Sequence, residues 1–259
     1  MSVAGKTAIV LFNLGGPDSP EAVAPFLRNL FSDPAIITLP WFLRLPLAWT
    51  IAQGRAPVAR DIYAKIGGAS PIVRETQAQA RALEAALARD GIAAKAFIAM
   101  RYEHPFSDGA ARAVKAYNPD KIVLLPLYPQ FSTTTTASSL KDWKRAARKA
   151  GLDTPVAEIH CYPEEPGFIA AAAAKIRAAL QDAPAGPGWR LLLSAHGLPQ
   201  RIIDRGDPYQ RQVEQTAAAI VRELAMPELD AIVCYQSRVG RLKWIEPATD
   251  AEIRRGVEL

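Results

Sequence analysis

Cysteine is scarce in this chain of 259 residues, and its two copies lie far apart in the sequence. Cys161 and Cys234 form no CxxC pair, and two thiolates cannot supply the four ligands of an iron–sulfur cluster or of a structural zinc site. We therefore expect two buried, reduced thiols and no iron–sulfur cluster.

Several common sequence motifs of nucleotide-binding and catalytic sites are also missing. Gly15-Gly16 is followed directly by Pro17, so the chain lacks the GxGxxG loop that binds nicotinamide dinucleotides. It has no Walker loop, no HExxH pair and no GxSxG elbow. Nicotinamide binding is therefore excluded, and Ser194, two residues before His196, lacks the elbow that would support a nucleophilic serine.

The excess of positive charge is modest, and it is not gathered in one basic stretch. The net charge is +5, and the richest basic run, Lys141 to Lys149, is interrupted by Trp143 and two alanines, as on a solvated helix face. The chain has no aromatic-and-basic RNA motif and no zinc-finger spacing. We expect no nucleic-acid partner, and an anionic small substrate or an acidic membrane surface explains the charge equally well.

No terminal stretch combines the basic, apolar and small-residue zones of a secretory signal, so a cytoplasmic location is expected. One strongly apolar segment, Ile36–Ala52, is short for a membrane span and contains Pro40, Pro46 and Arg44. On pattern alone, this segment is equally well interpreted as a core helix or as an exposed apolar lip that contacts a flat apolar ligand or a membrane surface.

Apolar runs of strand length alternate with amphipathic segments of helix length, which is typical of an α/β fold. Most of the apolar runs are continuous, which predicts parallel sheets covered on both faces. The expected strands are 7–14, 94–100, 121–127, 156–161, 190–194 and 231–235. The expected helices are 20–31, 73–89, 108–117, 138–150, 166–181, 208–225 and 250–255.

A break rich in threonine and serine, near residues 133–139, divides the chain into comparable halves. We expect two Rossmann-like lobes that face each other across a cleft, residues 1–132 with the apolar lip and residues 133–259. Ligands of open parallel sheets bind beyond the carboxyl ends of the strands, which predicts an active cleft there. The unusual residues at those ends are Asn13 to Pro17, Arg101-Tyr102, Tyr128 to Ser132, Ala195 to Gly197 and Gln236 to Arg238.

Of the three histidines, only His196 stands at such a strand end with small neighbours, Ala195 and Gly197, that leave room for a bulky ligand. An imidazole, with a pKa of about 6.5, can accept a proton or bind a metal near neutrality. His104 and His160 are expected to be structural. Because one histidine cannot form a tight metal site, we expect either that His196 holds a metal only transiently or that this chain lacks further ligands.

Six segments resemble the ferrochelatase family, in the order in which that family has them. They are LFNLGGPDSPEAVAPFLRNLFSDPAIITLP, IYAKIGGASPI, MRYEHP, LYPQFSTTTTASS, LLLSAHGLPQRIIDRGDPY and CYQSRVGRLKWIEPATD, and they span nearly the whole chain. The resemblance implies a lyase of heme biosynthesis that inserts Fe²⁺ into protoporphyrin IX to give protoheme. Protoporphyrin and Fe²⁺ are then substrates, and no cofactor is permanently bound.

The resemblance also implies the roles of individual residues. His196 matches the family's active-site histidine, to which metal binding, acceptance of a pyrrole proton, or both are assigned. Arg101 and Tyr102 match a porphyrin-facing pair, Arg55 a basic residue that meets a propionate, and Trp244 an aromatic residue that packs against the macrocycle. For Arg55 the alignment is looser, and a surface ion pair explains the residue equally well.

The segment Ile36–Ala52 resembles the apolar mouth of the family's cleft. The resemblance therefore favours the exposed lip, with porphyrin entry and peripheral contact with the inner membrane, over the core helix. The sequence does not predict the oligomeric state.

The match departs near the end of the chain. The family continues into another strand and a segment like SEHxETLxELD, which carries a catalytic glutamate opposite the histidine. Here Arg241 and Glu246 stand where the family usually has Pro and Gly, and the match ends after residues 249–253. We therefore expect an incomplete second lobe. Two alternatives stay open: a weakly active or inactive form that binds porphyrin or metal, and a chelatase for coproporphyrin or sirohydrochlorin.

Overall fold

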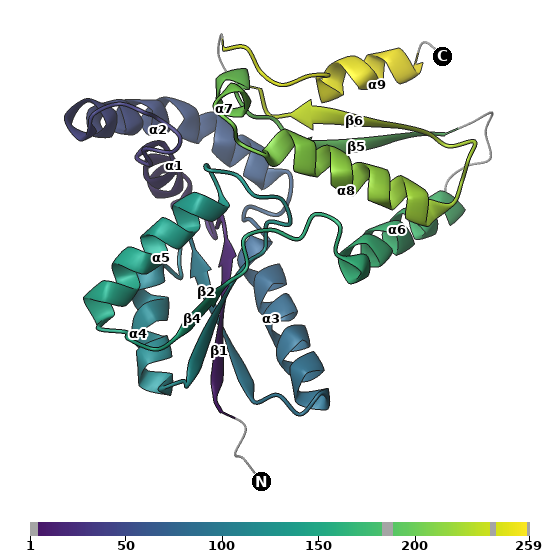
Figure 1. Ribbon diagram of the computed structural model, residues 1–259. Coiled ribbons are helices and arrows are strands. Elements are labelled where there is room, and N and C mark those ends of the chain that lie inside the picture. Colours follow the sequence, from purple (N-terminus) through teal and green to yellow (C-terminus); the bar gives the residue numbers. More distant parts are fainter. Residues whose placement is uncertain (1–4, 183–188, 239–241, 258–259) are drawn as a thin grey trace. The chain divides into compact units, whose positions relative to one another are not determined.

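The chain folds into two compact units (Figure 1). The structure is a computed structural model that describes residues 5–182, 189–238 and 242–257. The first unit comprises Met1–Tyr128 and Thr133–His160, and the second comprises Pro129–Ser132 and Cys161–Leu259. This division differs from the boundary expected after Ser132, because a helix and a strand that follow it belong to the first unit. Arg241, one of the two departures noted above, lies outside the described residues.

The first unit is built on a four-stranded parallel sheet in the order β2-β1-β3-β4. Its strands are β1 (Thr7–Asn13), β2 (Ala94–Met100), β3 (Lys121–Pro126) and β4 (Val156–Glu158). Thr7 aligns with Ala94 on one side and with Lys121 on the other, so these three strands begin together. The expected parallel α/β arrangement is confirmed.

Helices cover both faces of this sheet, as the continuous apolar strands predict. Helix α3 (Ile72–Arg89) packs on one face, against Ile9 and Leu11 of β1. Helices α4 (Ser107–Tyr117) and α5 (Thr136–Ala150) pack on the other, where the Phe12 and Trp143 rings meet edge to face at 5.9 Å. Both faces of the sheet are therefore covered, and its carboxyl edge is left as the place where side chains can meet a ligand.

The apolar segment forms part of a long helix that the sequence pattern did not predict as one element. Helix α2 (Trp41–Ala64) pairs with α1 (Val23–Phe31) and contains two prolines. Its buried residues are Ala48, Ala52 and Ala56, whose spacing of four puts small side chains on one face and lets α1 approach closely. None of the described helices is long and apolar enough to cross a membrane.

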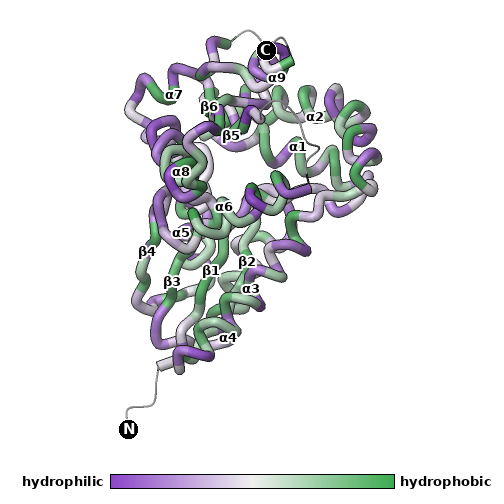
Figure 2. Tube along the Cα trace, turned by 90° about the vertical axis from the view of Figure 1, so that its right-hand side faces the viewer, coloured by the Kyte–Doolittle hydropathy of each residue, from purple (hydrophilic) through white to green (hydrophobic). Residues whose placement is uncertain are grey.

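Most large apolar side chains around α2 are exposed, and green segments run along it in Figure 2. Trp41 is 68% exposed and Trp49 56%. The full set is Leu39, Trp41, Phe42, Leu43, Leu45, Leu47, Trp49, Val58, Ile62 and Ile66. The segment is therefore not a core helix: from Trp41 onward it is helical, and it presents an exposed apolar surface, as the lip interpretation expects.

The second unit contains a parallel pair of strands, β5 (Arg190–His196) and β6 (Asp230–Gln236). Helices α6 (Pro166–Gln181) and α8 (Tyr209–Leu224) cover one face, and α9 (Thr249–Val257) contacts both strands from the other (Figure 1). Short helix α7 (Gln200–Asp204) follows β5 and was not expected. About three strands were expected in each half, but β4 joins the first sheet, which leaves this sheet with two strands in the described part of the chain.

Candidate active site

His196 is the last residue of β5, and Gln236 is the last residue of the neighbouring β6. The two are aligned in the parallel register, and the next residue, Gly197, donates its backbone N–H to the Gln236 carbonyl at 2.8 Å. The imidazole therefore stands at the carboxyl edge of this sheet, where parallel α/β folds bind their ligands.

Gly197 brings an aromatic ring close to the backbone beside His196. A Cβ atom at this position would lie 2.8 Å from the Gln236 carbonyl oxygen and 3.4 Å from Cε3 of Trp244, so only glycine fits. Trp244 also forms an antiparallel bridge with Pro199, and the Ile245 N–H donates to the Leu198 carbonyl at 3.1 Å. The structure thus brings together two residues singled out in the sequence, His196 and Trp244.

The imidazole of His196 keeps exposed surface, yet the protein around it disfavours the charged form. This desolvation lowers the pKa of His196 below its usual 6.5, so the ring is uncharged at neutral pH. Tyr209 lies beside the His196 backbone, and burial raises the pKa of its phenol to about 12. Near neutrality, the phenol thus stays protonated while the imidazole has a free lone pair.

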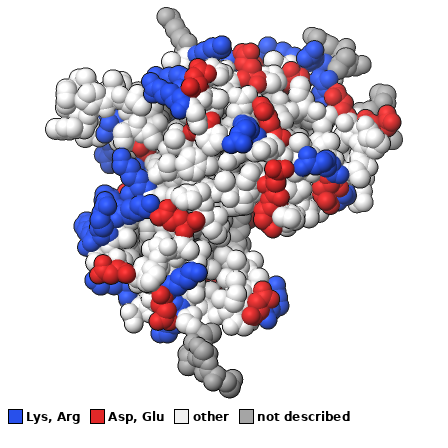
Figure 3. All heavy atoms as spheres, viewed as in Figure 1, with Lys and Arg blue, Asp and Glu red and all other residues white. Residues whose placement is uncertain are grey.

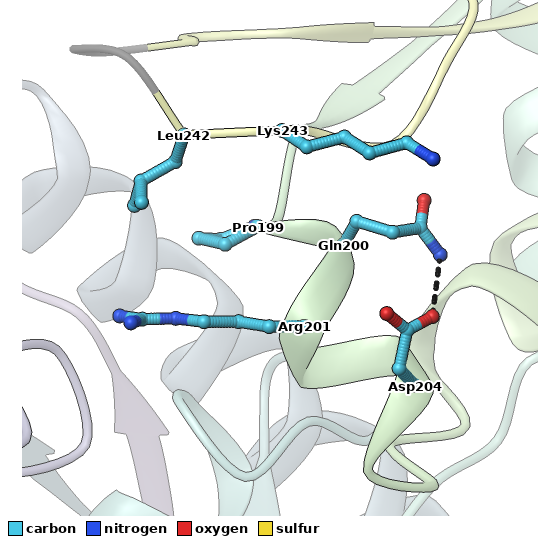
Figure 4. A pocket seen from close by; sticks show the side chains of 6 residues that line it. All are labelled: Pro199, Gln200, Arg201, Asp204, Leu242 and Lys243. Atoms are coloured by element: carbon cyan, nitrogen blue, oxygen red, sulfur yellow. Dashed lines mark hydrogen bonds between the residues drawn. The ribbon is translucent and has the colours of Figure 1, made fainter.

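A hollow of about 430 Å³ opens beside the Pro199–Trp244 bridge (Figure 4). Its lining residues are Pro199, Gln200, Arg201, Asp204, Leu242 and Lys243. The Gln200 amide donates to the Asp204 carboxylate at 3.0 Å, while the Arg201 and Lys243 side chains extend in opposite directions. The two cations do not converge on one point, so the hollow is not a formed anion site.

In the first unit, Arg101 and Tyr102 follow β2 and meet a buried carboxylate. Arg101 Nη2 lies 2.7 Å from Asp33 Oδ2, and the Tyr102 hydroxyl donates to the same oxygen at 2.8 Å. Ser138, in the first turn of α5, also donates to it. Burial raises the pKa of Asp33, but the bonds from Ser138, Arg101, Ala35 and Tyr102 outweigh it and leave the pKa below its usual value.

In this cluster, the two members of the predicted porphyrin-facing pair differ in how far they are exposed. The Tyr102 ring is fully buried, and burial together with the nearby Asp33 charge raises the pKa of its phenol. The Arg101 side chain retains 21% of its exposure. Arg101 is therefore the member of the pair with surface available to a ligand. The Tyr102 ring packs against the guanidinium group, with its centroid 4.9 Å from the guanidinium carbon.

Arg55 projects from the exposed side of α2, with its guanidinium carbon 6.0 Å from the centre of the Phe31 ring. Among the described residues of the first unit, it makes no bond to the cluster around Asp33. The sequence left two roles open for Arg55, contact with a propionate and a surface ion pair. In the structure, its guanidinium makes a cation–π contact with Phe31.

Asp33, Ser138 and Tyr209 were not predicted as site residues from the sequence. Asp33 is a single acid after an apolar helix, and its side-chain partners lie 68 to 105 positions further along the chain. In residues 5–182, 189–238 and 242–257, no three histidine, cysteine or acidic side chains are grouped so that they could hold a metal ion.

The surface charge is mixed. Figure 3 shows Lys and Arg spread among Asp and Glu, with the end of α2 at upper left almost free of charge. The basic run of α5 is largely ion-paired, because Arg145 contacts Asp108 and Asp142 while Lys144 contacts Glu158. The basic run therefore does not form a bare cationic stripe.

Comparison with known proteins assigns the family. The family model described as Ferrochelatase matches residues 6–258. The ferrochelatase of Caulobacter vibrioides (strain NA1000 / CB15N) is 58% identical over 252 residues, which are 96% of this chain and 72% of that protein. Those of Phenylobacterium zucineum and Pelagibacter ubique are 56% and 47% identical, over 96% and 95% of this chain and 72% and 71% of their own lengths. The chain therefore belongs to the ferrochelatase family, and it is a lyase of heme biosynthesis that inserts Fe²⁺ into protoporphyrin.

Proposed function

We propose that His196 is the residue of this ferrochelatase that meets the reacting centre, as a ligand of the incoming Fe²⁺, as acceptor of a pyrrole proton, or in turn as both. The observation that carries the proposal is the place of the exposed His196 side chain, at the carboxyl end of β5 and next to Gly197, against which Trp244 lies. The pKa of the imidazole, which desolvation lowers, agrees with both roles. An imidazolium has no free lone pair and could fill neither role.

The reaction exchanges one Fe²⁺ for two pyrrole protons, and iron keeps its oxidation state. A neutral imidazole nitrogen has one lone pair, so it binds metal or takes a proton at any one moment, not both. Because its pKa lies below 6.5, the imidazolium formed by proton acceptance readily releases its proton to solvent at neutral pH. The ring is then ready to take up the second proton.

We assign the substrate contacts to side chains that offer matching surfaces. Trp244, partly exposed beside Gly197, offers an aromatic surface on which a flat macrocycle can stack. Arg101 offers guanidinium N–H groups for a propionate, a pairing that suits its planar geometry. Arg55 is a second, exposed candidate for a propionate contact.

We further propose that the lip Ile36–Ala52 contacts the surface of the inner membrane and admits the poorly soluble porphyrin. Support comes from the exposed Trp41, Phe42 and Trp49, since large apolar and aromatic side chains favour the boundary between lipid headgroups and acyl chains. This contact is peripheral, because the polar and basic residues of α2 keep part of the helix in water.

Replacement of His196 tests the central assignment. His196→Ala is expected to lower kcat for Fe²⁺ insertion at least about 100-fold, the usual scale for loss of a proton-transfer group. The Kd for protoporphyrin, measured by spectral titration without metal, should change little. The matched control is His104→Ala, an exposed histidine of the first unit that should leave both values unchanged. A His196→Ala enzyme with near-normal kcat would refute the proposal.

A further inference from the structure

Asp33 follows α1 and is only 4% exposed. A charged carboxylate is unstable in such a place unless partners compensate it. Asp33 has four: Ala35 N–H donates to Oδ1 at 2.8 Å, while Arg101, Tyr102 and Ser138 all reach Oδ2. The carboxylate thus joins the end of α1, the end of β2 and the start of α5.

The arrangement fixes one edge of the Arg101 guanidinium. Nη2 lies against Asp33 Oδ2 at 2.7 Å, and Nε donates to the Ser138 hydroxyl at 2.8 Å. The backbone is held as well, because the Arg101 N–H donates to the Asn13 carbonyl at 2.9 Å. The Tyr102 ring below supplies a cation–π contact. Arg101 is therefore restrained on its inner edge and on one face.

The third guanidinium nitrogen of Arg101, Nη1, is available to donate a hydrogen bond to a ligand. Within the described residues, Nη1 of Arg101 has no hydrogen-bond partner, although the side chain is partly exposed. A side chain held in one orientation before it binds loses less conformational freedom when a ligand arrives. The free Nη1 is thus a pre-positioned donor for one oxygen of a carboxylate.

We propose that Asp33 is a positioning residue that holds Arg101 so that Nη1 donates to a carboxylate of the porphyrin. The proposal rests on the assignment of Arg101 to substrate binding, but it is independent of the role given to His196. Asp33 itself does not touch the substrate. Its effect should appear in porphyrin binding and not in the chemical step.

The primary test is Asp33→Asn, which keeps the shape of the side chain and removes its charge. We expect KM for protoporphyrin to rise about tenfold, equivalent to about 1.4 kcal/mol, while kcat stays within about twofold of the unsubstituted enzyme. The matched control is Glu252→Gln, because Glu252 is another buried carboxylate, only 5% exposed and paired with Arg190. That change should leave KM unchanged even where it lowers the melting temperature.

A double-substitution cycle separates positioning from general destabilisation. Arg101→Ala should raise KM, and adding Asp33→Asn to it should raise KM no further. Protoporphyrin dimethyl ester, which has no free carboxylate, should show no effect of Asp33→Asn at all. The proposal is overturned if Asp33→Asn lowers kcat and leaves KM unchanged, or if it raises KM equally in the Arg101→Ala enzyme or with the ester.

A third variant keeps the proposal testable should Asp33→Asn fail to fold. Ser138→Ala removes the acceptor of Arg101 Nε and leaves the Arg101–Asp33 ion pair in place. We expect a smaller rise in KM with unchanged kcat, and an unchanged KM would refute the positioning role. If Arg101→Ala itself leaves KM unchanged, this inference fails, while the kcat of His196→Ala still decides the role of His196 separately.

Discussion

His196 is uncharged at neutral pH because the surrounding protein desolvates its imidazole and lowers its pKa. If the neutral ring is the active form, activity is lost as the pH falls through this lowered pKa and not at the ordinary value of about 6.5. The acid limb of kcat/KM for metal insertion, which reports groups of the free enzyme, should therefore have its midpoint below about pH 6.5. Kinetics between about pH 5 and 8 with Zn²⁺, a metal that does not oxidise, measures it.

A higher midpoint would contradict this prediction. A midpoint at or above about pH 6.5 would mean that a different group governs the limb, or that the imidazole of the free enzyme is not desolvated. Porphyrin binding followed over the same pH range without metal is the control, since it separates protonation of His196 from protonation of the substrate.

Some candidate site residues could be selected from the sequence and others could not, for a physical reason. His196 stands at the end of an apolar strand between small residues, so local pattern was enough to select it. Trp244 was selected only because its segment resembles the ferrochelatase family. Asp33 takes its role from Arg101 and Ser138, which only the folded sheet brings to it. No local rule pairs a single acid with groups so distant in the chain, and thus the cluster became visible only in the structure.

At the level of elements, the six strands were predictable because continuous runs of valine, isoleucine and leucine indicate buried parallel strands. Helix α2 was not predictable, because Pro46 and Pro57 lie inside it and proline normally breaks a helix interior. Its apolar residues also lie around much of its circumference, so the 3.6-residue period that indicates an amphipathic helix is weak. Packing of the Ala48, Ala52 and Ala56 face near α1 helps to stabilise it despite the prolines.

The exposed face of α2 leads to a prediction about lipid binding. The triple variant Trp41→Ser, Phe42→Ser and Trp49→Ser should weaken binding to phospholipid vesicles at least about tenfold, since each loses a large buried apolar area in the lipid. Co-sedimentation with vesicles of a neutral and an anionic phospholipid measures this. The control is Val58→Ser, on the same helix, 62% exposed and outside the lip. Equal binding of the triple variant and the unsubstituted enzyme would refute the membrane role of the lip.

At the scale of the whole molecule, the two sheets differ in how completely they are covered. In β1, five consecutive residues from Ala8 to Phe12 are buried, with helices on both faces. In β5, every residue keeps some exposure, and Ser194 and His196 are exposed. An α/β fold was predictable for both units, but this difference in burial was not. The three leucines of β5 are as apolar as the Ile-Val-Leu run of β1, and burial depends on which helices cover each strand.

This difference predicts unequal local stability. Amide groups open to exchange through local unfolding, and segments with fewer buried apolar contacts open at lower free energy. Hydrogen–deuterium exchange followed by mass spectrometry should therefore show β1 and β3 exchanging at least about tenfold more slowly than β5 and β6, a gap of about 1.4 kcal/mol in opening free energy. Peptides from α3 and α8, which are both amphipathic helices packed on a sheet, provide the internal comparison for each unit.

If protoporphyrin binds at the edge that carries His196, its addition should slow exchange at the carboxyl ends of β5 and β6 and leave the centre of β1 unchanged. Equal protection of both sheets in the free enzyme would show that partial burial does not set the stability of the second unit.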